Sequence, residues 1–268
     1  MFVKRVTMAI LFVLALLVRM PLQAEDDFLS RYDDDELSKS GKDKFVGGTI
    51  GYHEHSLETY KRQLDYLNKC NYGFKIDKLD GETYEGEIYF GVRMENHGIL
   101  VGLGGFPQTK AELHWSDGVK GETTIDAYFI DCTYRYYFLP KKYFTQSDLR
   151  GLLLPYIGGG VGYYQIKWAF NDSRAIWSLE GSGNLQSPSA NKDTIGYHLV
   201  YGVEKFIDTN ISVNLQGGYR WADSGNFELQ RTSTTDTITY WVAQIGGENV
   251  SVELDGVTFT IGINYHWK

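Results

Sequence analysis

The sequence predicts an all-β fold, an eight-stranded antiparallel up-and-down transmembrane β-barrel. Three features support this prediction: a leader of the secretory type, eight segments in which apolar and polar residues alternate, and an amphipathic final segment. In the final segment, six apolar side chains alternate with polar residues or glycine: Val257, Phe259, Ile261, Ile263, Tyr265 and Trp267. Such a strand presents one face to lipid and the other to a polar interior.

The first 24 residues have the features of a cleaved secretory signal peptide. Lys4 and Arg5 precede an apolar run over residues 8–18, and Ala24 stands at a plausible cleavage point. The run is shorter than the ~20 residues that a transmembrane helix needs. Residues 25–44 are dominated by charge, so we expect an acidic, disordered lead-in in the periplasm. The barrel domain is expected over residues 45–268.

Eight segments with a period of two follow the lead-in, and each is long enough to cross a bilayer as a tilted strand. They are residues 45–55, 84–94, 99–115, 122–139, 152–170, 194–207, 211–221 and 257–267. Pro107 indicates a bulge in the third segment. Connections after the second and sixth segments are short, whereas those after the first, fifth and seventh are long. This alternation is typical of outer-membrane barrels with both termini in the periplasm.

Two alternatives to this architecture stay open. Residues 223–248 contain the strand-like run TITYWVAQI, which could form a protruding hairpin or two further membrane strands, giving ten. A water-soluble barrel shows the same alternation with its apolar face turned inward. The signal peptide and the aromatic content of 15% favour the membrane form, because membrane barrels place aromatic residues at both interfaces.

Three segments, residues 155–164 (PYIGGGVGYY), 196–221 and 256–267, resemble the small outer-membrane barrels of the OmpA-like and OmpW-like group. The resemblance covers the strand regions between residues 45 and 267 and implies the outer membrane of a Gram-negative-type envelope. The closing pattern of Thr260, Gly262, Tyr265 and Trp267 resembles the C-terminal signal that barrel-assembly machinery binds. The family usually ends on the aromatic residue itself, whereas here Lys268 follows it. The OmpW-like resemblance also implies a porin-like channel for ions or small solutes.

The predicted inward faces of the strands carry charge. The predicted lumen charge network comprises Glu87, Arg93, Asp131, Arg135, Lys167, His198, Glu204 and Arg220. Counting from the turns places four of these nearer the periplasm: Arg93, Asp131, Arg135 and Glu204. Unpaired charges in so narrow a barrel would be costly, so ion pairs are expected. These pairs would form either a structural plug or a narrow, gated channel.

The sequence gives little support for catalytic, metal or cofactor sites, and we predict no catalytic residue and no cofactor. The glycine run at residues 158–162 continues into a strand rather than into the helix that a phosphate-binding loop precedes. His53 and His55 are weak metal-ligand candidates near the outer rim that need a third donor such as His114. Cys70 and Cys132 could pair in an oxidising envelope, but Cys132 is expected to face lipid.

Residues 56–69 have apolar side chains at helical spacing, which predicts an amphipathic helix at the barrel mouth. This helix would cap the barrel, or contact lipopolysaccharide or a host surface. The leading hypothesis is a non-enzymatic structural or surface-interaction element that acts through long extracellular loops. The alternatives are the channel and, third, a lipid-modifying enzyme. Expected partners are outer-membrane lipid, lipopolysaccharide, the assembly machinery and an extracellular surface partner, but not nucleic acid, because the net charge is −8.

Overall fold

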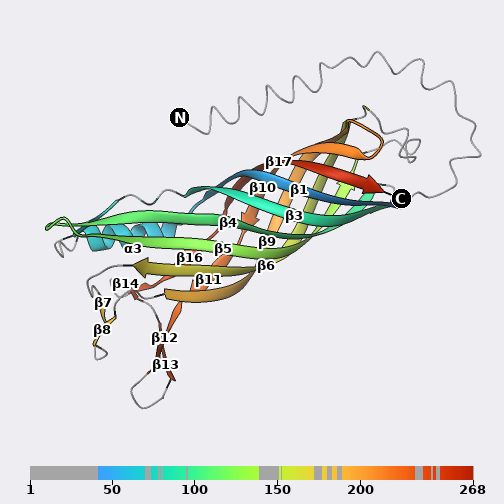
Figure 1. Cartoon of the computed structure of the whole chain (residues 1–268). Coiled ribbons are helices and arrows are strands. Elements are labelled where there is room, and N and C mark those ends of the chain that lie inside the picture. Colours follow the sequence, from blue (N-terminus) through green and yellow to red (C-terminus); the bar gives the residue numbers. More distant parts are fainter. Residues whose placement is uncertain are drawn as a thin grey trace, which may run out of the picture.

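The computed structural model of this chain is a closed barrel of eight antiparallel strands, drawn in Figure 1. The structure describes residues 42–69, 74–77, 79, 81–94, 96–138, 151, 153–171, 177–179, 183–185, 189–232, 238–242, 244–245 and 248–267. The predicted signal peptide, most of the lead-in and Cys70 therefore lie outside the described residues. Within those ranges, no helix is long and apolar enough to cross a bilayer.

Eight long strands form the barrel wall. They are β1 (Lys42–His55), β3 (Glu82–Met94), β4 (His97–Trp115), β5 (Lys120–Tyr137), β6 (Leu153–Asn171), β9 (Ser189–Phe206), β10 (Ile211–Trp221) and β17 (Gly256–Trp267). Neighbours in this series pair with one another, and β1 closes the ring against β17 from Lys44↔Trp267 to His55↔Gly256. The prediction of eight strands is confirmed. The alternative of ten is wrong, because the described strands between β10 and β17 pair only among themselves.

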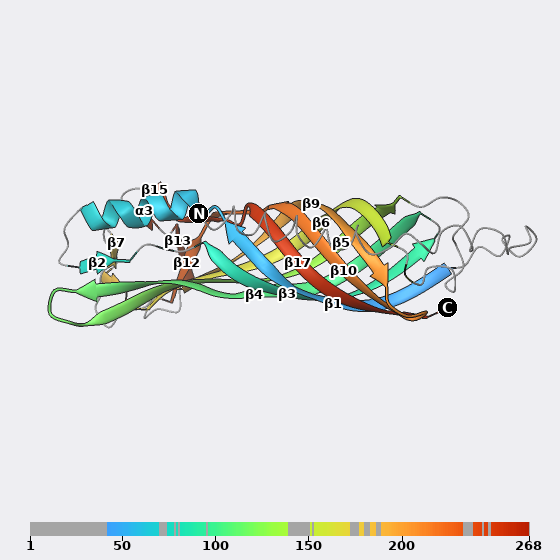
Figure 2. The ribbon, with the colours of Figure 1, turned by 90° about the horizontal axis from the view of Figure 1, so that it is seen from above.

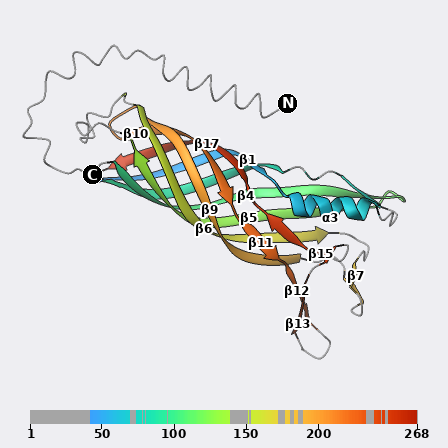
Figure 3. The same ribbon diagram turned by 180° about the vertical axis from the view of Figure 1, so that it is seen from behind.

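The shorter elements gather at the end of the barrel away from β1's first residue and the C-terminus (Figures 1 and 3). The predicted helix is present as α3 (Glu58–Lys69), and β2 (Phe74–Ile76) adds to the edge of β4. The others are β7 (Trp177–Leu179), β8 (Gly183–Leu185), β11 (Asp223–Asn226), β12 (Glu228–Thr232), β13 (Ile238–Val242), β14 (Gln244–Ile245), β15 (Glu248–Asn249) and β16 (Ser251–Glu253). This end is the extracellular one, because the start of β1, the end of β17 and the short turns after β3 and β9 lie opposite.

An apolar band surrounds the half of the barrel that holds the start of β1 and the end of β17. Ile50 and Ile88 are each 70% exposed there, and Leu103 is 63% exposed, while their neighbours along each strand point inward. An exposed apolar surface of this kind around a closed barrel is what a bilayer covers. Cys132 lies on this outer face as a free thiol, as its place in the alternation predicts.

Beyond the band, the inward-facing side chains of the strands are apolar instead of polar. On β4, the outward Leu103 gives way to the inward Ala111 and Leu113, because the register shifts between Phe106 and Thr109 and moves the alternation by one residue. This irregularity is the bulge that Pro107 predicts. The outer ends of β4, β5, β6 and β9, together with α3, β2, β11 and β16, thus enclose an apolar core like that of a water-soluble protein. We call this assembly the extracellular unit; its core contains twenty buried apolar side chains in the part that the structure describes.

Helix α3 is fixed to the extracellular unit by polar contacts to several different strands. Thr59 donates to a carboxylate oxygen of Glu253 at 2.6 Å, where α3 packs against β16. Asn68 exchanges two hydrogen bonds with the backbone of Ile76 in β2, at 2.7 and 2.9 Å. Tyr60, fully buried, contacts β5 and β6 at once. The helix is therefore a packed cap of the barrel mouth, one of the two roles expected from its sequence.

Tyr60→Phe is expected to lower the free energy of unfolding of the extracellular unit by about 1–3 kcal/mol, the cost of leaving a buried donor unsatisfied. The Trp168 indole N–H donates to the Tyr60 hydroxyl at 2.6 Å, and that hydroxyl bonds to Thr123. Burial raises the pKa of Tyr60 to about 12, so its hydroxyl keeps its proton at neutral pH. Urea titration followed by tryptophan fluorescence measures the change. Tyr66→Phe, on the same helix but 46% exposed, is the control and should stay within about 0.5 kcal/mol.

Candidate functional site in the barrel interior

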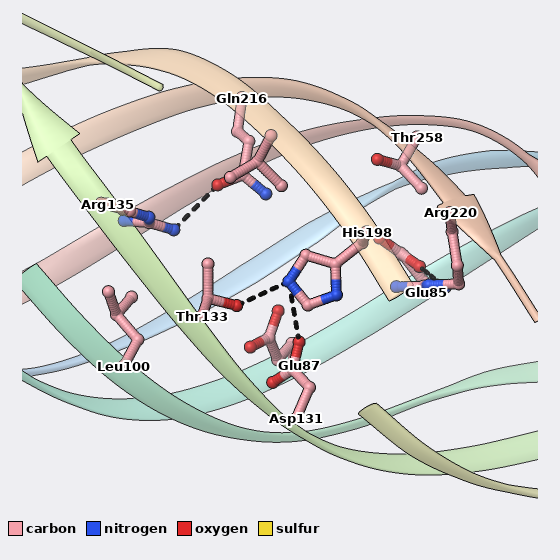
Figure 4. A pocket seen from close by; sticks show the side chains of 11 residues that line it. Glu85, Glu87, Leu100, Asp131, Thr133, Arg135, His198, Gln216, Arg220 and Thr258 are labelled. Carbon is pink, nitrogen blue, oxygen red and sulfur yellow. Dashed lines mark hydrogen bonds and ion pairs between the residues drawn. The ribbon is translucent and has the colours of Figure 1, made fainter. Parts of the chain in front are cut away.

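Polar side chains predominate inside the membrane-spanning half, where a soluble protein would have its apolar core. They form three connected groups. The periplasmic cluster consists of Asp43, Arg93, Glu204, Ser212, Asn264 and His266. The central cluster consists of Tyr89, Arg135, Tyr156, Asn214 and Gln216. The outer cluster consists of His53, Glu85, Glu87, Asp131, Thr133, His198 and Arg220, and Figure 4 shows most of it.

Glu204 is the hub of the periplasmic cluster. One of its carboxylate oxygens accepts from Ser212 at 2.5 Å and from Asn264 at 2.8 Å, and lies 3.2 Å from Nε2 of His266. The other oxygen lies 3.8 Å from the Arg93 guanidinium. Glu204 is 1% exposed. A buried carboxylate is tolerated in such a place only because charged and polar partners surround it.

Asp43 completes the charge balance of this cluster. Its Oδ2 accepts from Arg93 at 2.7 Å and lies 2.9 Å from Nδ1 of His266. Both ring nitrogens of His266 therefore face carboxylates, an arrangement that the doubly protonated ring satisfies because both nitrogens are then donors. Two cations and two carboxylates then close the periplasmic end. Asp43 was expected in the lead-in, but β1 begins at Lys42, so the last residues of that segment already belong to the barrel wall.

The central cluster is built around Arg135, which is 3% exposed. Its guanidinium donates to Gln216 at 2.8 Å and lies over the Tyr156 ring, 4.6 Å from the ring centre. Tyr156 donates to the same Gln216 oxygen at 3.1 Å. Tyr89 donates to Asn264 at 2.6 Å, which connects this layer to the periplasmic cluster. Arg135 is thus stabilised by ring stacking and amide contacts, with no carboxylate bonded to it in the described network.

The outer cluster contains one tight ion pair. Arg220 donates to Glu85 at 2.9 Å, and His53 lies 3.3 Å from the same carboxylate oxygen. The guanidinium also stacks on Phe129 at 4.7 Å, at the floor of the extracellular core. These contacts close the outer end of the lumen beneath the extracellular unit.

Two carboxylates of the outer cluster lie close together without a strong cationic partner. His198 bonds to Thr133 at 2.7 Å and is 3.7 Å from Asp131. Glu87 and Asp131 crowd the same glycine: a Cβ on Gly102 would meet oxygens of both, at 2.0 and 2.6 Å. Gly102 therefore has to lack a side chain, because only then do both carboxylates fit between β3 and β5. The middle of the lumen therefore holds two carboxyl groups beside one histidine.

The cavity between the central and outer clusters is small. The space between Glu87, Asp131, Arg135, His198 and Arg220 amounts to about 20 Å³, enough for a single water molecule. An eight-stranded barrel is just wide enough for its side chains to fill it. The interior is therefore a packed polar core in this conformation.

Most of the predicted lumen residues lie inside the barrel, with one exception. Glu87, Arg93, Asp131, Arg135, His198, Glu204 and Arg220 all point inward. Lys167 does not: it is exposed on the outward face of β6, between the buried Ile166 and Trp168. The predicted layering also needs a correction. Asp131 joins His198 in the outer cluster, and Arg135 lies in the central cluster, so neither belongs to the periplasmic one. β17 turns Thr260 and Gly262 inward and Tyr265 outward; their role in assembly remains a prediction.

Several interior residues were missed. Glu85 lies two residues before Glu87 on the same face of β3, so the period of two places it in the lumen. His266 lies by the same rule on the polar face of β17. His53 and His55 were expected at a solvated rim, but they are 0% and 2% exposed and stack on each other inside the mouth. His114 is on the opposite, outward face of its strand, so the three do not form a site.

No protein-family model matches this chain, and no curated protein sequence is similar to it. Solved structures share its fold. A major outer membrane protein from Thermus thermophilus aligns with 85% of this chain and 100% of its own, with 9% identity and a TM-score of 0.51. OprG from Pseudomonas aeruginosa aligns with 85% of this chain and 97% of its own, with 14% identity and a TM-score of 0.45. Neisserial surface protein A aligns with 85% and 99%, with 14% identity and a TM-score of 0.42.

The comparison with the Thermus thermophilus protein agrees with the physical evidence on the fold. The closed ring of eight strands, the apolar outer band and the polar interior are the three features that define a barrel in a bilayer. The fold is that of the small outer-membrane β-barrels, and this chain is an integral outer-membrane protein.

Proposed function

We propose that this protein is a non-enzymatic surface element, in which a closed barrel anchors a folded extracellular unit that contacts an external partner. One observation carries the proposal: the lumen is filled by buried charges, while the same strands build a core of twenty apolar side chains beyond the membrane. A chain that only conducted solutes would have no use for so large an external core above a filled lumen. The assembly machinery and lipopolysaccharide are further proposed partners, as for any protein of this location.

A narrow cation path is the second candidate function. It is favoured by the adjacent carboxyl groups of Glu87 and Asp131, which line a small polar cavity. Such a path would need Arg135 and Arg220 to move aside, because both contribute to the lining of that cavity. A lipid-modifying enzyme is not supported, since His53 and His55 face the barrel interior rather than the outer leaflet.

Two variants, each assayed for two phenotypes, distinguish these functions. Leu113→Asp places a charge at a fully buried position of the extracellular core, and Arg135→Ala alters only the lumen. Cells that produce each protein are tested for attachment to immobilised matrix proteins and glycans and for uptake of small hydrophilic solutes. We expect wild-type cells to attach, Leu113→Asp to abolish attachment, and Arg135→Ala to preserve it. Wild-type production that raises solute uptake, with attachment absent or unaffected by Leu113→Asp, would overturn the proposal in favour of a channel.

A further inference from the structure

We propose that the outer face of the extracellular unit binds a divalent transition-metal ion, with Zn²⁺ as the best match, between Asp77, Glu112 and His114. Their donor atoms all lie within 4.8 Å of one another. The group combines one imidazole nitrogen with two carboxylate oxygens from separate segments of the chain. Imidazole with carboxylate suits Zn²⁺ and its neighbours better than Ca²⁺ or Mg²⁺, which take oxygen ligands alone.

The backbone of two paired strands holds the three donors in place. Glu112 and His114 are two residues apart on β4, so both project outward while Ala111 and Leu113 enter the core. Strand β2 lies along this part of β4 (Figure 2), with Ile76 opposite Leu113. Immediately after β2, the Asp77 amide donates to the Glu112 carbonyl at 2.8 Å. The register thus brings the Asp77 side chain next to the other two without a long, flexible connection.

The distances from His114 to the two carboxylates are close to those around a tetrahedral ion. Zinc bonds of about 2.0–2.2 Å to nitrogen and oxygen separate neighbouring donors by about 3.3–3.6 Å. Nε2 of His114 lies 3.1 Å from Oδ2 of Asp77 and 3.8 Å from Oε2 of Glu112. These separations lie on either side of the tetrahedral value, so small side-chain rotations produce it. Three protein ligands leave the fourth position for water or for a donor group of an external molecule.

The exposure of His114 sets it apart from most histidines of the chain. His53, His55, His198 and His266 are buried in the barrel, and His97 bonds to Tyr134 at 2.6 Å near the periplasmic end. The His114 side chain is 38% exposed, and those of Asp77 and Glu112 are 56% and 45% exposed. An ion in the medium can therefore reach the three donors directly, with no opening of the fold.

One cation already competes for this position. Nζ of Lys120 lies 3.4 Å from Oε2 of Glu112 and belongs to a side chain that is 68% exposed. Surface ion pairs of this kind contribute little to stability, so the ammonium can turn into solvent when a metal binds. Its positive charge nevertheless opposes a second cation. Removal of Lys120 is therefore expected to tighten metal binding, an effect opposite in sign to the removal of a ligand.

Zinc affinity of the full-length protein, refolded in detergent and titrated against a colorimetric zinc chelator, tests the site. We expect one equivalent to bind to the wild type. His114→Ala and Glu112→Gln should weaken its affinity at least about tenfold, whereas His97→Ala, the other exposed histidine, should leave it unchanged. Lys120→Gln should tighten binding severalfold. Equal affinity of the wild type and His114→Ala, or no stoichiometric binding by the wild type, would overturn the proposal.

Cobalt provides a second readout that does not depend on affinity. Co²⁺ at a tetrahedral site gives visible absorption bands, and we expect them in the wild type and in His97→Ala but not in His114→Ala. Each variant is first checked for a heat-modifiable band on a gel, which shows that its barrel is folded. Bands that persist in His114→Ala would place the metal elsewhere, for example on the acidic residues 25–36, and contradict the assignment.

Discussion

Glu204→Gln is expected to lower the free energy of unfolding of the barrel by about 3–5 kcal/mol, the cost of removing one partner from a buried ion pair. The substitution keeps the shape of the side chain but removes its charge. Arg93 and His266 would then share Asp43 as their only carboxylate in the periplasmic cluster. Urea unfolding in lipid bilayers, followed by tryptophan fluorescence, measures the loss.

Glu54→Gln is the matched control for this prediction, because Glu54 is an exposed carboxylate on β1. Its effect should stay within about 0.5 kcal/mol, as is usual for surface substitutions. If Glu204→Gln were as stable as Glu54→Gln, the periplasmic cluster would not contribute to the stability of the barrel.

Arg135→Ala has the second large expected effect, on permeability. The side chain occupies the middle of the lumen and is held by Gln216 and the Tyr156 ring. Its removal vacates the volume of a whole guanidinium and leaves Glu87 and Asp131 with one fewer cation nearby. We expect proteoliposomes with Arg135→Ala to admit small cations several times faster than wild-type proteoliposomes, because the free space becomes wide and acidic.

Lys167→Ala is the control for permeability. It removes the same charge from a strand that also lines the lumen, but from the outward face. The permeability of this variant should equal that of the wild type. Identical rates for all three proteins would show that Arg135 does not limit passage.

The period-two pattern was sufficient to predict the strands and their inward faces. The alternation along β17 correctly places four polar residues inside the barrel: Thr258, Thr260, Asn264 and His266. The same rule, applied with one fixed phase, fails on the outer half of β4. On β4, the shift at Pro107 exchanges the two faces, and only the register against β5 reveals that Ala111 and Leu113 face inward.

Lys167 shows the second limit of the sequence evidence. Its neighbours Ile166 and Trp168 are apolar, so the alternation continues unbroken along β6, but the apolar face has become the inner one. Alternation tells which residues share a face, but not whether that face meets lipid or a core. The answer depends on where the membrane ends, which is set by the height of the apolar band around all eight strands together.

The period-two pattern does not predict which residues far apart in the sequence contact one another. Asp43 meets His266, which is 223 positions away in the sequence, because β1 and β17 close the ring. Asp77 joins Glu112 and His114 because a three-residue strand, β2, docks on β4. Neither contact can be predicted from the nearby sequence, because each depends on the register between two strands rather than on spacing along the chain.

Single-channel recording of the refolded wild-type protein in planar bilayers tests the central claim that charged side chains close the barrel. We predict a silent protein at neutral pH, with discrete openings only after Arg135→Ala. Reproducible openings of the wild type, of the same size as those of the variant, would contradict the closed-barrel account and make the protein a channel.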